Sequence, residues 1–225
     1  MKTSSIPTQF ATALLALWLG ASLAPAAPIT ITPGNPGNAG TDNVLFNDSS
    51  LLHSGTLVQG NFAGPGTSIV DFTSASGNHM IQGSGGQATL SGLEGNNPFL
   101  SLTFALEGGL TFTKAILNPD ATNDSPEFST IDFVVNYIDA AGSPFMQSFS
   151  LDPNGQNFFG IVAGDGAKIT SVTFSTPNAA FDNAAQFRIG GIETPTRVPD
   201  GGSTALLIGA SLISLAFLRR RMPVL

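Results

Sequence analysis

A run of oxygen-bearing side chains between residues 118 and 127 is the part of this sequence best suited to holding a metal ion. It contains three acids and two asparagines, and prolines punctuate it at 119 and 126. Carboxylate and amide oxygens are the hard ligands that Ca²⁺ prefers, although the spacing differs from that of an EF-hand because no glycine occupies the bend. We expect a loop between strands that either binds calcium or is a solvated acidic loop. The candidate calcium ligands are Asn118, Asp120, Asn123, Asp124 and Glu127.

The chain has few residues suited to nucleophilic catalysis or to thiolate chemistry. The chain has two histidines, His53 and His79, and neither lies in a G-x-S-x-G motif or a comparable one. Their separation is not a pattern typical of zinc sites. The absence of cysteine excludes disulfides, thiol nucleophiles and thiolate metal sites. We expect no cofactor apart from the calcium considered above.

Glycoside hydrolysis is harder to dismiss, because it requires only two carboxyl groups about 5–9.5 Å apart. Asp132 with Glu127, or Glu94 with Glu107, would be such a pair. However, Asp132 lies on the face of its expected strand that is opposite the apolar face. Its carboxylate would therefore be exposed to solvent. The only tryptophan is Trp18, near the N-terminus, so sugar stacking would fall to tyrosine or phenylalanine. We therefore expect a protein that is not an enzyme, with a carbohydrate-active hydrolase as an alternative.

The elements that would position these groups are short β-strands. From about residue 44 onward, apolar runs are separated by Gly, Pro, Asn and Asp, and 128–138 alternates most clearly. No ten-residue stretch of the body carries the apolar stripe of a helix. We expect an all-β fold, an antiparallel β-sandwich or jelly roll, flanked by a signal-peptide helix and a C-terminal membrane helix. The expected strands lie near 56–58, 68–72, 79–81, 87–90, 99–106, 112–117, 128–138, 146–151, 158–163, 168–174 and 185–192.

The residue types at two positions between these strands predict turns. Asp139-Ala140-Ala141-Gly142 links the strands on either side of it, and Asp165-Gly166 is typical of a tight β-hairpin turn. We expect a turn between strands at the first and a hairpin at the second.

The pattern of the N-terminal segment predicts an export signal. Residues 1–26 combine a basic start at Lys2, an apolar stretch from Phe10 to Leu23, and an Ala24-Pro25-Ala26 cleavage site, so we expect cleavage before Ala27. Residues 27–43, rich in Gly, Pro and Asn, are expected to be a flexible leader. Residues 44–197 would then form the β-sandwich ectodomain.

The body between the two ends is acidic. Removing Lys2 and three arginines near the C-terminus leaves four of the eight basic residues, and removing Asp200 leaves fourteen of the fifteen acids. The net charge of the body is therefore about −10. Binding to nucleic acid is excluded, because four scattered cations cannot neutralise a run of phosphates.

Residues 198–225 have the layout of a membrane-sorting signal. Ala205 to Leu218 carries no charge and would form a helix of about 21 Å, short of the bilayer's roughly 30 Å hydrocarbon core. Ser203 and Thr204 extend it, and arginine side chains can snorkel to the headgroups. The following Arg219, Arg220 and Arg221 are expected to stay in the cytoplasm, which places the preceding chain outside.

This tail resembles the C-terminal sorting signals of the PEP-CTERM class, in particular the VPDSG-CTERM variant. Val198, Pro199, Asp200 and Gly202 match the motif, and Gly201 stands where that variant usually has serine. The resemblance implies recognition by an exosortase, a membrane-embedded cysteine transpeptidase, with cleavage near the motif and loss of the helix. It also implies a Gram-negative-type host that makes exopolysaccharide.

The segment from Asn154 to Ile192 carries a second resemblance. Asn154-Gly155-Gln156-Asn157-Phe158-Phe159, Ile169-Thr170-Ser171-Val172-Thr173-Phe174 and Gln186-Phe187-Arg188-Ile189-Gly190 look like the all-β ectodomain often found upstream of such sorting signals. That ectodomain has no assigned activity, so the resemblance transfers no catalytic residue.

Taken together, these features predict an exported, exosortase-processed protein of the cell surface or extracellular matrix. Its expected role is structural or adhesive, with exopolysaccharide or the cell envelope as partner and only transient membrane anchoring. The alternatives are a carbohydrate- or Ca²⁺-binding module and the hydrolase considered above.

Overall fold

The computed structural model describes residues 28–34, 37, 40–62, 68–74, 81–84, 88–93, 98–121, 130–152, 158–177 and 180–194. Within those ranges the chain forms β-strands and one short 3-10 turn, η2 (Glu107–Gly109). The signal peptide 1–26 and the sorting signal 198–225 lie outside them. None of the helical structure in these ranges is long and apolar enough to cross a bilayer. The strands are β1 (Ile29–Pro33), β2 (Asp42–Leu45), β3 (Ser54–Gly55), β4 (Leu57–Phe62), β5 (Ile69–Ser74), β6 (Ile81–Ser84), β7 (Thr89–Gly92), β8 (Ser101–Leu106), β9 (Lys114–Ala121), β10 (Ile131–Ile138), β11 (Pro144–Leu151), β12 (Phe159–Ala163), β13 (Lys168–Ser175) and β14 (Phe181–Gly190).

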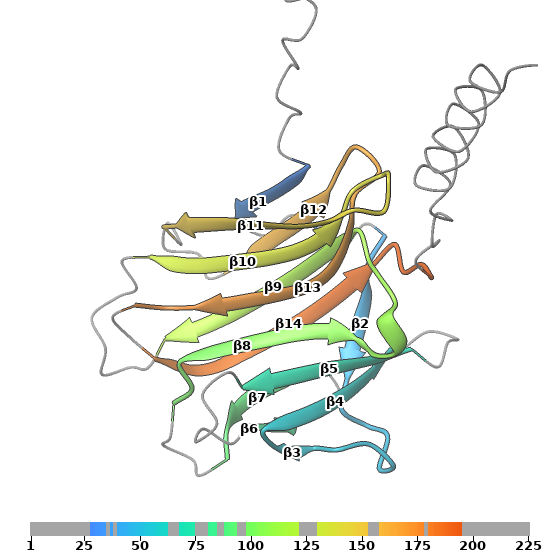
Figure 1. Cartoon of the computed structure of the whole chain (residues 1–225). Coiled ribbons are helices and arrows are strands. Elements are labelled where there is room, and N and C mark those ends of the chain that lie inside the picture. The colour runs from blue at the N-terminus through green and yellow to red at the C-terminus, as the bar shows by residue number, and fades with distance from the viewer. Residues whose placement is uncertain are drawn as a thin grey trace, which may run out of the picture.

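The strands form two antiparallel sheets joined through β2 (Figure 1). Sheet A runs β1-β12-β9-β14, and both β7 and β2 pair with the far side of β14. Sheet B runs β2-β4-β5-β8-β13-β10-β11. The predicted all-β, antiparallel fold is confirmed.

Alternation along the strands decides which side chains are buried. In β10, Ile131, Phe133, Val135 and Tyr137 are buried and the residues between them are half-buried, as their period of two predicts. The inward faces of the two sheets meet in a core rich in phenylalanine. Ring centroids approach across the sheets at Phe72–Phe187 (4.8 Å), Phe133–Phe159 (4.9 Å) and Phe174–Phe181 (5.2 Å). The two sheets therefore pack face to face as a sandwich.

The expectation of a flexible leader over 27–43 does not hold for the described part of that segment, which contains strands. Ile29–Pro33 is strand β1, which pairs antiparallel with β12, and Ile29 and Ile31 are buried in the core. Strand β2 begins at Asp42. The sequence Ile29-Thr30-Ile31-Thr32 already carries strand alternation, but the Gly/Pro/Asn content that follows it obscured this. The described fold thus begins before residue 44.

The two predicted turns have different outcomes. Asp139 to Gly142 closes the β10–β11 hairpin, and a carboxylate oxygen of Asp139 accepts hydrogen bonds from the amides of Ala141 and Ser143. Asp165 and Gly166 form the expected tight turn, with φ of 52° and 75°. The strands that this second turn joins, β12 and β13, pair in opposite sheets, so the predicted hairpin there is wrong.

Candidate functional site

Only part of the expected calcium loop lies in the described residues, and that part is not a loop. Asn118 and Asp120 belong to β9, which pairs with β14 as far as Ala121. Strand β12 pairs with β9 only up to Leu117, so Pro119 lies where β9 has a neighbour on one side and a missing N–H is tolerated. A strand rather than a loop therefore presents these two residues.

The remaining calcium candidates, Asn123, Asp124 and Glu127, fall outside the described residues. Asp120 is exposed and accepts a hydrogen bond from the Nδ2 of Asn183 at 3.2 Å. The described ranges contain no group of three His, Cys, Asp or Glu side chains arranged to hold a metal ion. Calcium binding stays a prediction.

The carboxylate pairs considered for hydrolysis are each only half described. Asp132 is half-buried in β10 and Glu107 is exposed in η2, whereas Glu127 and Glu94 lie outside the described residues. Of the histidines, His79 is likewise outside, and His53 packs edge-on against Phe46 with a centroid distance of 6.3 Å. The three described residues, Asp132, Glu107 and His53, form no catalytic pair on their own, and the hydrolase alternative stays a prediction.

One carboxylate has a shifted pKa for a purely local reason. The hydroxyl and the amide of Ser50 both donate to Oδ1 of Asp48, at 2.7 and 2.9 Å. These bonds, the hydroxyl's first, lower the pKa of Asp48 because they stabilise its charged form. Asp48 is fully exposed, so this interaction fastens a turn and does not mark a reactive group.

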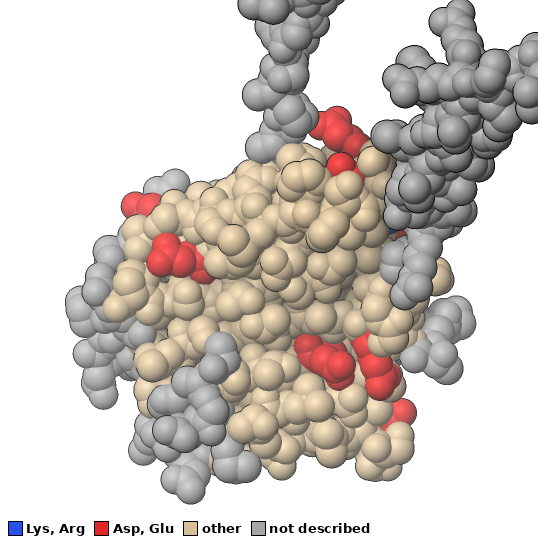
Figure 2. Space-filling view, viewed as in Figure 1, with Lys and Arg blue, Asp and Glu red and all other residues tan. Residues whose placement is uncertain are grey.

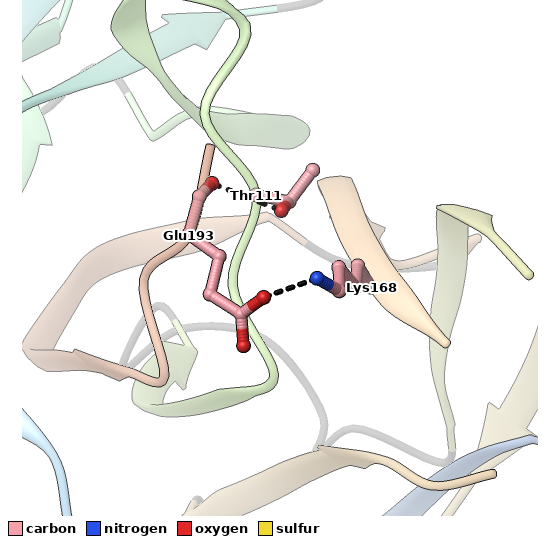
Figure 3. A network of polar contacts seen from close by, with 3 residues as sticks. All are labelled: Thr111, Lys168 and Glu193. Carbon is pink, nitrogen blue, oxygen red and sulfur yellow. Dashed lines mark hydrogen bonds and ion pairs between the residues drawn. The ribbon is translucent and has the colours of Figure 1, made fainter. Parts of the chain in front are cut away.

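The end of the described chain is fastened to the fold at Glu193 (Figure 3). Thr111 and Glu193 exchange two backbone hydrogen bonds of 2.9 and 2.8 Å, and the buried Thr111 hydroxyl also donates to the Glu193 carbonyl at 3.1 Å. The ammonium of Lys168 forms an ion pair with the Glu193 carboxylate. Two other segments, at Thr111 and at Lys168, thus hold Glu193 near the end of the last described range.

A cleft of about 210 Å³ lies on the outer face of sheet A, and we name it the sheet A pocket. Its centre is a cross-strand row in which Gly160 of β12 stands between Thr32 of β1 and Ile116 of β9. Because glycine has no side chain, the row is hollow at its middle. The lining residues are Thr32, Gly37, Thr41, Lys114, Ala115, Ile116, Gly160, Ile161 and Val162.

Two of the described cations lie at or beside the sheet A pocket. The described ranges contain three cations, of which Lys168 is paired with Glu193. Lys114, which also has an interaction of its own, lines the pocket, and Arg188 lies across the β9–β14 ladder from the lining residue Ile116. None of the described residues that line the pocket is acidic. Among the described residues, the face drawn in Figure 2 shows carboxylates but no Lys or Arg.

Sequence reasoning missed this pocket. Two signals pointed to it: a glycine inside an apolar strand, which often marks a close approach of another group, and a lysine among only four basic residues of the body. Neither signal revealed that β9 and β12 are neighbours, which is what brings Lys114 and Gly160 together.

Comparison with known proteins finds few similarities. No family model matches the chain, and no curated protein matches it. Among solved structures the chain is similar to one described as "Xylan-Binding Domain from CBM 22, formally x6b domain", with 14% sequence identity, 69% of this chain and 97% of that chain covered, and a TM-score of 0.30. A likeness of this strength supports no statement about the ligand or activity of this chain.

Proposed function

We propose that this protein is exported, processed by an exosortase, and displayed at the cell surface or in the extracellular matrix, where its β-sandwich has a structural or adhesive role. The observation that carries the proposal is the position at which the described fold ends. Among the described residues, Glu193 is the last one bridged to the sandwich, and Val198, the start of the sorting motif, follows after four residues. Those four residues span at most about 14 Å.

The short connection suits a domain presented by a membrane tail. In this scheme, residues 1–26 direct export, Ala205 to Leu218 halts in the bilayer, and Arg219 to Arg221 hold the end of the chain inside. The motif at 198–202 then lies beyond the last fastened residue of the sandwich. Cleavage there would release the sandwich whole.

The adhesive part of the proposal is supported by the edge strand β11. Phe145 and Met146 are adjacent on this strand and are 49% and 67% exposed. The strand carries no charge from Pro144 to Leu151, whereas natural edge strands are commonly guarded by charged residues. An uncharged edge with exposed apolar side chains suits contact with another surface.

The test is to express the full chain in cells that contain an exosortase and to compare it with the motif variant Asp200→Ala. We expect the wild-type sandwich to co-sediment with the cell envelope or its polysaccharide without its tail, while Asp200→Ala stays in the membrane fraction with its tail. No new reducing ends should appear in the polysaccharide. Identical fractionation of the two forms would contradict processing, and release of sugar would favour the hydrolase.

A further inference from the structure

Strand β11 is the outermost strand of sheet B, and within the described residues it is bonded to a neighbour, β10, on one side (Figure 1). Strand β1, the edge of sheet A, lies near it, but β1 pairs with β12 and no bridge joins it to β11. The other edge of β11 therefore presents peptide groups that no strand in the described ranges uses. Open strand edges of this kind are templates on which a further strand can be added.

The register of the β10–β11 hairpin fixes which peptide groups point outward. The amide of Asp139 donates to the carbonyl of Ser143 at 2.9 Å, and the ladder continues from this pair with Tyr137 opposite Phe145. In an antiparallel ladder every second residue bonds to the neighbouring strand, so the odd-numbered residues of β11 face β10. Its even-numbered residues therefore direct their backbone groups away from β10, and the described residues give those groups no other partner. They are Pro144, Met146, Ser148 and Ser150.

This outward edge is self-complementary about Ser148. When a second copy adds its own β11 antiparallel, with the two Ser148 residues opposite each other, Met146 of each copy lies opposite Ser150 of the other. All of these residues direct their backbone groups outward, so the three opposed pairs form about six hydrogen bonds. Pro144 has no N–H, but it lies at the end of the row, opposite Asp152 of the other copy, and interrupts none of these bonds.

The same register also gives partners to side chains on the inner face of β11. Phe145, which is 49% exposed, comes to lie opposite the half-buried Leu151 of the other copy. The two Gln147 residues lie diagonally across the two-fold axis, at the roughly 7–8 Å that long side chains can span. Oε1 of Gln147 is buried and accepts no hydrogen bond within the described residues. The amide nitrogen of the second Gln147 can donate to it.

The distribution of charge favours a second copy at this edge. The body carries a net charge of about −10, so two copies repel each other over most of their surfaces. From Pro144 to Leu151 there is no charged side chain, and two copies can approach along this strand with little repulsion. A contact of this kind uses the same strand on both copies, so it closes at two and leaves no second β11 edge open.

We propose that two copies of this protein pair through β11, antiparallel and centred on Ser148, so that sheet B continues from one sandwich into the other. The inference rests on the proposed adhesive use of β11 and deepens it by naming the partner as a second copy of the chain. Pairing is measured on purified protein and processing is measured in cells, so either can fail while the other holds.

The test is sedimentation equilibrium of the exported protein purified from cells, in density-matched detergent if the tail is retained. We expect a reversible dimer with a dissociation constant in the micromolar range, because a contact along one strand is at the small end of specific interfaces. The mass should not exceed that of two copies. Hydrogen exchange followed by NMR should show the amides of Met146, Ser148 and Ser150 protected in the dimer and unprotected in the dilute monomer.

Substitutions at Ser148 localise the contact, because its side chain is exposed and its N–H points away from β10. Ser148→Lys places two ammonium groups face to face and should weaken dimerisation by at least about ten-fold. Mixing Ser148→Lys with Ser148→Asp should restore a dimer, since opposite charges then meet across the pair. Thr73→Lys, at an exposed position of the inner strand β5, is the matched control and should leave the dissociation constant within about two-fold of wild type.

Several results would overturn the proposal. A protein that stays monomeric throughout the micromolar range does not use a second copy as its partner, and loss of polysaccharide binding in a monomeric Ser148→Lys variant would make the polysaccharide the occupant of this edge. A dimer that Ser148→Lys leaves unchanged has its contact elsewhere. Growth beyond two copies, or a dimer whose β11 amides stay unprotected, would show that the contact is not an added strand.

Discussion

Replacing Phe187 with alanine is expected to lower the free energy of unfolding by about 3–5 kcal/mol. Phe187 is 1% exposed and lies between two rings of the opposite sheet, 4.8 Å from Phe72 and 5.7 Å from Phe104. The alanine variant loses both ring contacts and leaves a cavity where sheet A meets sheet B. The chain has no disulfide that would limit this destabilisation. Because domains are commonly stable by only about 5–15 kcal/mol, this loss is severe.

The measurement is urea unfolding followed by circular dichroism, with Phe145→Ala as the matched control. Phe145 is the same residue type but is 49% exposed on the edge strand β11, where it stacks on Tyr137. Its truncation should cost no more than about 1 kcal/mol. Similar losses for the two variants would contradict a core shared by the two sheets.

Replacing Gly190 with alanine is expected to destabilise the fold by up to about 3 kcal/mol, although only one methyl group is added. A Cβ on Gly190 would lie 1.9 Å from the carbonyl oxygen of Gly40 and 3.1 Å from the Cα of Thr41. These neighbours are backbone atoms, which cannot turn away as a side chain can. The Gly40–Thr41 segment must therefore move off β14. Because Thr41 lines the sheet A pocket, the shape of the pocket should change as well.

Gly164→Ala is the control for this prediction. A Cβ on Gly164 would meet no atom closer than the Pro28 carbonyl oxygen at 3.6 Å, an ordinary contact. Gly164 also has no positive φ, so alanine is tolerated there and even restricts the unfolded chain. Thermal unfolding of the two variants distinguishes them. Equal melting temperatures would show that the Gly40–Thr41 segment does not press on Gly190.

The strands were predictable where their pattern was local. In β10, the burial of Ile131, Phe133, Val135 and Tyr137 follows directly from their alternation, and the β10–β11 hairpin follows from Asp139 to Gly142. Strand β1 was missed because its alternation covers only four residues before a Gly/Pro/Asn stretch. Its stability comes from pairing with β12, about 130 positions away in the sequence.

Partners between distant strands were not predictable, because a strand's pattern identifies its buried face and not its neighbours. The Asp165-Gly166 turn shows this: its residue types predicted the backbone, yet β12 and β13 go to opposite sheets. For the same reason the candidate site was not foreseen. Lys114, Thr32 and Gly160 are far apart in sequence and meet only through the order β1-β12-β9. Sequence reasoning emphasised the acids near residue 120, whereas the described pocket lies at the other end of β9.

Mass spectrometry of both termini of the protein recovered from cells that carry an exosortase tests the account most directly. We predict a chain that begins at Ala27, ends within Val198–Gly202, and yields no peptide from Ala205 to Leu225. A protein that keeps its first 26 residues and its arginine end would contradict the account.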